Sequence, residues 1–319
     1  MKARRRRFVA NECTHVYQRT VDGVMLFYDY EDYLVFYMIV SVIARKYKIR
    51  LLEMCLMIDH VHLLIASDSL EDMAAFVRDY TSVFAREYNY SVGRHGQLFK
   101  KSYGSAPKVG DKKIRSTIVY IGNNPVEKKL CVSADEYRWN FLKYHVCRSP
   151  FSAALPKSQC SRSLRRCIGL VNAVADAGCY LNYAQMYGMF SKLNERDKEI
   201  LTDHIITIYN PFDGGILNYY DDYEQMIGAM RSTTGAEHDI KEVWHNGTDR
   251  IYHDMTDWLK KYLKRHSVRN VIVLPVERKL ELAELLIRYT GARQFEVAKF
   301  LHLKFFVALN MRILKELRV

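Results

Sequence analysis

The sequence predicts an α+β protein, in which a small sheet is covered by helices on one face and is followed by an all-α C-terminal region. Over the first 148 residues, segments that alternate like strands take turns with segments of helical periodicity. After the stretch 149–162, which is rich in Pro and Ser, only helical periodicity remains. With 319 residues, 49% hydrophobic and 26% charged, the chain is long enough for two globular domains.

The elements of the first half can be assigned in order from their patterns. A helix over 29–47 carries apolar residues at helical spacing, and Ser69 with Asp72 three residues later is an N-terminal capping signal for the next helix. Pro125 is the stop signal of a later helix. The predicted series is a strand over 15–20, a helix over 29–47, a strand over 51–65, a helix after Ser69, a basic hairpin or loop, and a helix over 112–124 capped by Asp111.

The second half is predicted to be helical throughout. The expected helices span 164–179, 183–193, 195–209, 220–231, 248–266, 276–289, 295–301 and 304–317. The last three resemble a helix-turn-helix near 276–317, although three packed helices without a role in DNA binding have the same pattern. If the motif is real, its DNA-facing side chains would be Lys304, Asn310 and Arg312.

Two histidines, His60 and His62, lie inside the apolar run 56–65. In a strand, alternate side chains share one face, so the two imidazoles would converge while Val61 anchors the other face in a core. Imidazole is the commonest metal ligand in proteins. A strand with two solvated histidines would be the simpler interpretation if this pair stood alone.

A second segment, about sixty residues later, favours a metal site over a strand with two solvated histidines. Tyr120 and Asn124 are four residues apart in the predicted helix 112–124 and therefore lie on one helix face. A phenol and an amide oxygen can then face the same partner.

Together the two segments resemble the REP-associated tyrosine transposases, which belong to the IS200-like, single-tyrosine HUH superfamily. The family's Met-x-x-His-U-His-Leu-Leu strand, where U is a hydrophobic residue, is matched by 57–64, and its Tyr-Ile-x-x-Asn-Pro-Val helix by 120–126. Residues 15–20 look like its first strand, and 137–139 like its closing Tyr-x-Trp. Many relatives carry Trp-Gln before the Phe-Tyr element that precedes the tyrosine helix; this chain has Gln97-Leu98-Phe99 there.

The resemblance implies a ferredoxin-like sheet over 1–148 and a specific chemistry. Tyr120 would attack a phosphodiester of single-stranded DNA and leave a 5′-phosphotyrosine and a free 3′-hydroxyl, on hairpins formed by repetitive extragenic palindromes. A phenol is a weak nucleophile at neutral pH, so the phosphate must be polarised. His60, His62 and the Asn124 oxygen would hold Mg²⁺ or Mn²⁺ for this purpose, and a site without thiolates argues against structural zinc.

The charge of the chain fits an acidic partner such as nucleic acid. The net charge is +12, and residues 1–148 hold 24 basic against 16 acidic residues. We expect DNA contacts from side chains near the tyrosine helix and from the N-terminal arginine run, although any of them can also be merely solvated. These candidates are Arg4, Arg5, Lys100, Lys101, Lys108, Lys112, Lys113 and Arg115.

The cysteines and the hydropathy indicate a cytoplasmic protein. The seven cysteines form no C-x-x-C pair and their odd number argues against a disulfide framework. No apolar run is long enough to cross a membrane, and no signal-peptide core follows the basic N-terminus. With the family resemblance, this implies a bacterial, nucleoid-associated enzyme.

Several alternatives stay open. The chain is either an active transposase or a non-catalytic DNA-binding protein or repressor that keeps the fold. A relaxase or replication initiator with the same chemistry would typically carry a further helicase or plasmid-specific domain. Because every catalytic candidate precedes residue 125, the C-terminal region is expected to contribute DNA affinity or target choice. Both a monomer and a homodimer fit the sequence.

Overall fold

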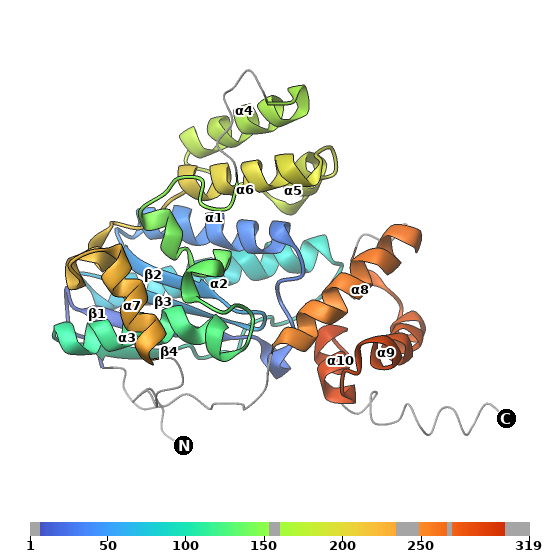
Figure 1. Ribbon diagram of the computed structural model, residues 1–319, viewed down its shortest axis with the longest axis horizontal. Coiled ribbons are helices and arrows are strands. Elements are labelled where there is room, and N and C mark those ends of the chain that lie inside the picture. Colours follow the sequence, from blue (N-terminus) through green and yellow to red (C-terminus); the bar gives the residue numbers. More distant parts are fainter. Residues whose placement is uncertain (1–6, 153–159, 234–248, 267–269, 304–319) are drawn as a thin grey trace.

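A computed structural model describes residues 7–152, 160–233, 249–266 and 270–303 (Figure 1). Its centre is a four-stranded antiparallel sheet of order β2-β3-β1-β4, built in the chain order β-α-β-β-α-β. This arrangement confirms the predicted α+β class with a ferredoxin-like sheet. The elements are β1 (Cys13–Arg19), α1 (Tyr30–Lys46), β2 (Arg50–Leu56), β3 (His60–Ala66), α2 (Leu70–Ser91), β4 (Gly104–Lys108) and α3 (Asp111–Glu127).

The single strand predicted over 51–65 is wrong, because the chain folds back within it. β2 ends at Leu56, and β3 starts at His60 and pairs with it antiparallel. The backbone N–H of Met57 donates to the His60 carbonyl at 2.9 Å and closes this tight turn. Both strands are buried and apolar, so the residue pattern carries no break that would reveal the turn.

Two helix ends and one loop also differ from expectation. α3 continues through Pro125 to Glu127, and its N-cap is Gly110 instead of Asp111. The basic stretch before α3 contains β4, which pairs with β1 at the edge of the sheet. The predicted Ser69 cap is confirmed, since its Oγ accepts the Asp72 backbone N–H at 2.9 Å.

Helices lie on both faces of the sheet, whereas the sequence predicted them on one face, because α3 also packs on the strands. α1 and α2 pack against each other on the face that buries Val16 and Leu63, and α3 crosses the other face. α1 is buried on nearly every side because α5 and α6 pack against its outer surface (Figure 1). The described C-terminal helices are α4 (Arg162–Asp176), α5 (Tyr183–Phe190), α6 (Glu195–Ile208), α7 (Tyr223–Thr233), α8 (Arg250–His266), α9 (Val276–Thr290) and α10 (Gln294–Phe300).

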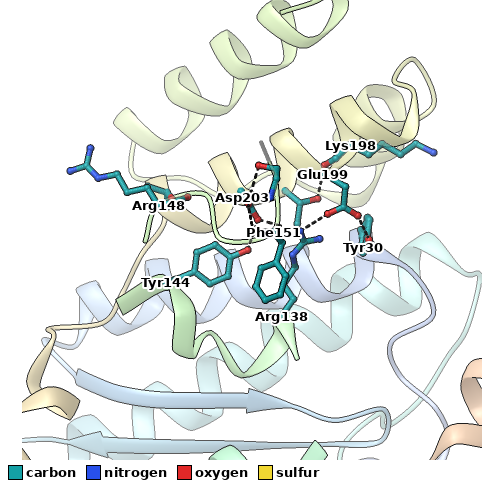
Figure 2. A network of polar contacts seen from close by, with 11 residues as sticks. Tyr30, Arg138, Tyr144, Arg148, Phe151, Lys198, Glu199 and Asp203 are labelled. Atoms are coloured by element: carbon teal, nitrogen blue, oxygen red, sulfur yellow. Dashed lines mark hydrogen bonds and ion pairs between the residues drawn. The ribbon is translucent and has the colours of Figure 1, made fainter. Parts of the chain in front are cut away.

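A polar network joins the segment after α3 to α6 (Figure 2). Arg138, 8% exposed, forms ion pairs with Glu199 and, at 3.3 Å, with Asp203. Asp203 also accepts the Tyr144 hydroxyl at 2.6 Å and the backbone N–H of Ser152 at 2.9 Å. The network therefore ties the segment before the expected linker, and the first residues of that linker, to a buried carboxylate that lies beyond it.

The C-terminal end shows part of the expected helix-turn-helix. α9 and α10 are present and are separated by a short turn that begins with Gly291, in the left-handed conformation at φ 71°. Lys304, Asn310 and Arg312 lie outside the described residues. Within the described ranges, no helix is both long and apolar enough to cross a membrane.

Candidate active site

The two histidines of β3 occupy one face of the sheet. Across the β1–β3 ladder, Tyr17 pairs with His62 and Arg19 pairs with His60, so these four side chains leave the sheet on the same side. The imidazole ring centroids of His60 and His62 are 4.9 Å apart at an interplanar angle of 86°. Val61 is fully buried on the opposite face and anchors the strand in the core.

Tyr120 lies over this histidine face. Its ring centroid is 5.6 Å from that of His62, nearly perpendicular at 88°. It is 5.8 Å from the ring centroid of His15, which β1 places on the same face. The helix α3 therefore brings the phenol to the histidine pair, as a tyrosine nucleophile acting beside a metal would require.

Asn124 follows one turn later on α3 and is 2% exposed. Its side-chain nitrogen makes no hydrogen bond within the described part of the chain, although a buried amide normally has a partner. The described residues include no group of three or more His, Cys, Asp or Glu side chains that could hold a metal ion. The predicted ligand set contains two such residues and an amide. Two imidazoles and one amide oxygen could hold a divalent cation if water molecules complete its coordination.

Each histidine of the pair has a hydrogen bond at Nδ1. His60 Nδ1 lies 2.5 Å from Asp59 Oδ1, and His62 Nδ1 lies 3.0 Å from His15 Nε2. Burial, together with the nearby His60, holds the pKa of His62 well below its usual range, so this imidazole is neutral at physiological pH. A neutral imidazole is the form that can bind a metal.

The Asp59 side chain is ionised although the protein surrounds it. Burial raises the pKa of Asp59, but the hydrogen bond to His60, with Arg19 and Lys299 nearby, outweighs burial and lowers that pKa overall. Asp59 and His15 were not among the predicted site residues. The sequence signal for His15 is that it shares one face of β1 with Tyr17 and Arg19, because alternate residues of a strand point the same way. This signal becomes informative only when β1 is known to pair with β3.

Arg19 is the other side chain that sequence reasoning missed. It is half-buried, pairs directly with His60 and lies on the site face. The next segment is held beside it, since the Lys100 N–H donates to the Arg19 carbonyl at 2.9 Å. A guanidinium at this position can contact a phosphate that approaches the histidine pair.

The predicted DNA-binding side chains do not form one group. Lys100 and Lys101 are exposed beside the end of β1, whereas Lys112, Lys113 and Arg115 are exposed on the first turns of α3. Lys108 at the end of β4 is half-buried. Arg4 and Arg5 lie outside the described residues.

The whole site is buried. The exposed fractions of His60, His62, Tyr120 and Asn124 are 4%, 0%, 3% and 2%. C-terminal elements contact the helix and loops around these residues. The side chain of Asn123 donates to the Met230 carbonyl of α7 at 2.8 Å.

A second contact is made just before α8, where the N–H of Asp249 donates to the Lys128 carbonyl at 3.0 Å. A third contact involves Lys299 of α10, which lies beside Gly23 and Asp59. A Cβ atom built on Gly23 would lie 3.3 Å from Lys299 Nζ and 3.5 Å from Asp59 Oδ2. Because Tyr120 is only 3% exposed, elements around it must move before a phosphodiester can reach the phenol.

Comparison with known proteins agrees with the resemblance seen in the motifs. Residues 14–124 match the family model described as "Transposase IS200 like", and this segment contains the histidine pair, Tyr120 and Asn124. The matched segment makes up about a third of the chain. Among curated proteins, none matches the sequence significantly.

One solved structure similar to this chain is that of a REP-associated tyrosine transposase bound to a REP hairpin. It is 13% identical, has a TM-score of 0.39, and the alignment covers 50% of this chain and 96% of that one.

Proposed function

We propose that this protein is a metal-dependent transposase or endonuclease that cleaves and rejoins single-stranded DNA through a 5′-phosphotyrosine intermediate. The observation that carries the proposal is the position of Tyr120, whose ring lies over the histidine face of the sheet one helical turn before Asn124. The match of residues 14–124 to IS200-like transposases supports it.

In this function each residue has a distinct task. Tyr120 Oη attacks the phosphorus, a bond forms between that oxygen and the phosphorus, and the bond to the 3′-oxygen breaks. The phenol loses its proton and the departing 3′-oxygen gains one, so the reaction is balanced and can run backward to rejoin a strand. His60, His62 and Asn124 would hold Mg²⁺ or Mn²⁺. When bound, the ion withdraws charge from a non-bridging phosphate oxygen.

The proposed partner is a single-stranded or hairpin DNA, with REP-type hairpins suggested by the family resemblance. Exposed lysines beside the site and at the start of α3 would contact the phosphate backbone. The proposed domain organisation keeps 1–148 as the catalytic unit, 149–162 as a linker and 163–319 as a region for affinity or target choice. We place the protein in the bacterial cytoplasm, as a monomer or homodimer.

A non-catalytic DNA-binding protein or repressor is the second candidate, and the burial of Tyr120 favours it. If DNA never reaches Tyr120, the protein would bind DNA through its basic surface without cleaving it.

Covalent capture of a labelled oligonucleotide distinguishes the two functions. The full chain is incubated with hairpin or linear single-stranded DNA and Mn²⁺, and adducts are resolved by denaturing electrophoresis. We expect an adduct with the wild type, none with Tyr120→Phe, and DNA binding within a few-fold of the wild type in that variant. Tyr90→Phe, at a side chain that is 89% exposed, is the matched control and should form the adduct. An adduct that persists in Tyr120→Phe would exclude this nucleophile, and binding without any adduct in the wild type would favour the repressor.

A further inference from the structure

The two histidines of the pair have different hydrogen-bond partners at the same ring nitrogen, Nδ1. His60 Nδ1 is hydrogen-bonded to a carboxylate, Asp59, which precedes it in the chain. His62 Nδ1 is hydrogen-bonded to His15, which is 47 residues away in sequence and belongs to β1. The sheet register and not the local sequence brings this third imidazole to the site.

The contact between His15 and His62 has the geometry of a true hydrogen bond. The nitrogens are 3.0 Å apart and the ring planes differ by only 21°. The ring centroids are 5.2 Å apart, which exceeds the nitrogen separation by about the radii of two rings. The imidazoles therefore meet nitrogen to nitrogen instead of face to face, and one proton lies between them.

The identity of the donor decides what His62 can bind. A neutral imidazole carries its proton on one nitrogen and presents a lone pair on the other. If His62 Nδ1 donates to His15, then His62 Nε2 is a metal ligand. If His15 donates instead, His62 must carry its own proton on Nε2, which then cannot bind a metal.

We infer that His15 and Asp59 are a pair of positioning residues that commit His62 and His60 to the tautomer with a proton on Nδ1, so that both present Nε2 as the ligand nitrogen. This inference rests on the proposed function and deepens its metal site. Asp59 accepts through a charged oxygen, and His15 accepts through Nε2. Partners of this kind fix the ring orientation of histidine ligands and typically change metal affinity by about 10- to 100-fold when removed.

The tautomer can be observed without metal or DNA. In the full chain labelled with ¹⁵N-histidine, two-dimensional nitrogen–proton spectra distinguish a protonated Nδ1 from a protonated Nε2, and the His62→Ala variant assigns the signal. We expect wild-type His62 to carry its proton on Nδ1. In His15→Phe, which keeps an aromatic ring but lacks an acceptor, the proton should shift toward Nε2.

Metal affinity provides the second measurement. Mn²⁺ binding to the full chain is followed by the electron paramagnetic resonance signal of the free ion. We expect His15→Phe and Asp59→Ala each to weaken binding by about 10- to 100-fold. His15→Gln, whose amide oxygen has a similar reach, and Asp59→Asn should restore most of the affinity. His95→Phe, which makes the same substitution at an exposed histidine, is the matched control and should leave the affinity unchanged.

Two results would overturn the inference: a wild-type His62 protonated on Nε2, or wild-type Mn²⁺ affinity in His15→Phe. Failure of the proposed function gives different results. A covalent adduct in Tyr120→Phe would refute the nucleophile and leave the positioning by His15 and Asp59 intact. A wild-type chain that binds no Mn²⁺ would contradict the metal-dependent function, and the His62 tautomer would still decide between the two donor directions.

Discussion

Arg19 of β1 and His60 of β3 are direct partners across the antiparallel ladder, and their side chains leave the same face of the sheet. Arg19 is therefore the basic side chain that β1 supplies beside the histidine pair. The strand pairing fixes its backbone, so its approach to a bound phosphate costs less entropy than that of a lysine in a loop.

We expect Arg19→Ala to weaken binding of single-stranded DNA at low salt and to reduce the slope of log affinity against log salt by about 1, because one phosphate contact is lost. The measurement is a fluorescence anisotropy titration at several salt concentrations. Arg50→Ala, at an exposed position that starts the far edge strand β2, should leave the slope unchanged. Equal slopes for wild type and Arg19→Ala would remove Arg19 from the DNA interface.

Substitutions of the three proposed metal ligands are predicted to reduce cleavage to different extents. His60→Ala and His62→Ala should each abolish cleavage and its dependence on Mg²⁺ or Mn²⁺, because a lost imidazole is not replaced. Asn124→Ala should be milder, since a water molecule can occupy the position of one oxygen ligand. Cleavage is measured on a labelled hairpin across a metal titration, with the exposed His95→Ala as control. Full activity in excess chelator would contradict the metal site.

Asp203 is predicted to be the most sensitive point of the network that joins α6 to the segment 138–152. Asp203→Ala should lower the free energy of unfolding by about 3–5 kcal/mol, because it leaves the buried Arg138 guanidinium with fewer partners. Denaturant unfolding measures the change. Arg278→Ala, which breaks an exposed ion pair with Glu281, should cost less than about 1 kcal/mol. Equal effects of the two substitutions would show that the network does not hold the two parts together.

Glu53 on β2 predicts a stability that depends on pH. The side chain is fully buried, neither oxygen has a hydrogen-bond partner among the described residues, and burial holds its pKa well above the usual value of 4.5. Below pH 4.5 the carboxyl is protonated in the folded and unfolded states alike. As the pH rises further, the unfolded chain releases the proton that the folded chain keeps, so stability falls.

Glu53→Met should therefore stabilise the protein at pH 7, by about 1–3 kcal/mol, and the gain should shrink as the pH is lowered to 4.5. Denaturant unfolding of both proteins across this range is the measurement. Glu277→Met, at an exposed position at the start of α9, should show no such trend. A gain that is independent of pH would mean that Glu53 is not a source of the pH dependence.

Much of this protein is determined by local sequence. The spacing of apolar residues in α1, the Ser69 cap of α2 and the parity of His60 and His62 all follow from the period of a helix or a strand. The match of residues 14–124 to a transposase family follows from motifs that are contiguous in the chain. Such features need no knowledge of which segments meet.

Only the tertiary structure decided which strands pair and what surrounds the site. The edge strand β4, the hydrogen bond between His15 and His62 and the contact of Asn123 with α7 all depend on residues far apart in sequence, and the turn at 57–59 is set by the pairing of β2 with β3. A buried apolar strand looks the same whether it continues or folds back, and a histidine gives no local sign of the ring it will meet. Strand register therefore determined the site around His62, because register sets which side chains from distant segments share one face.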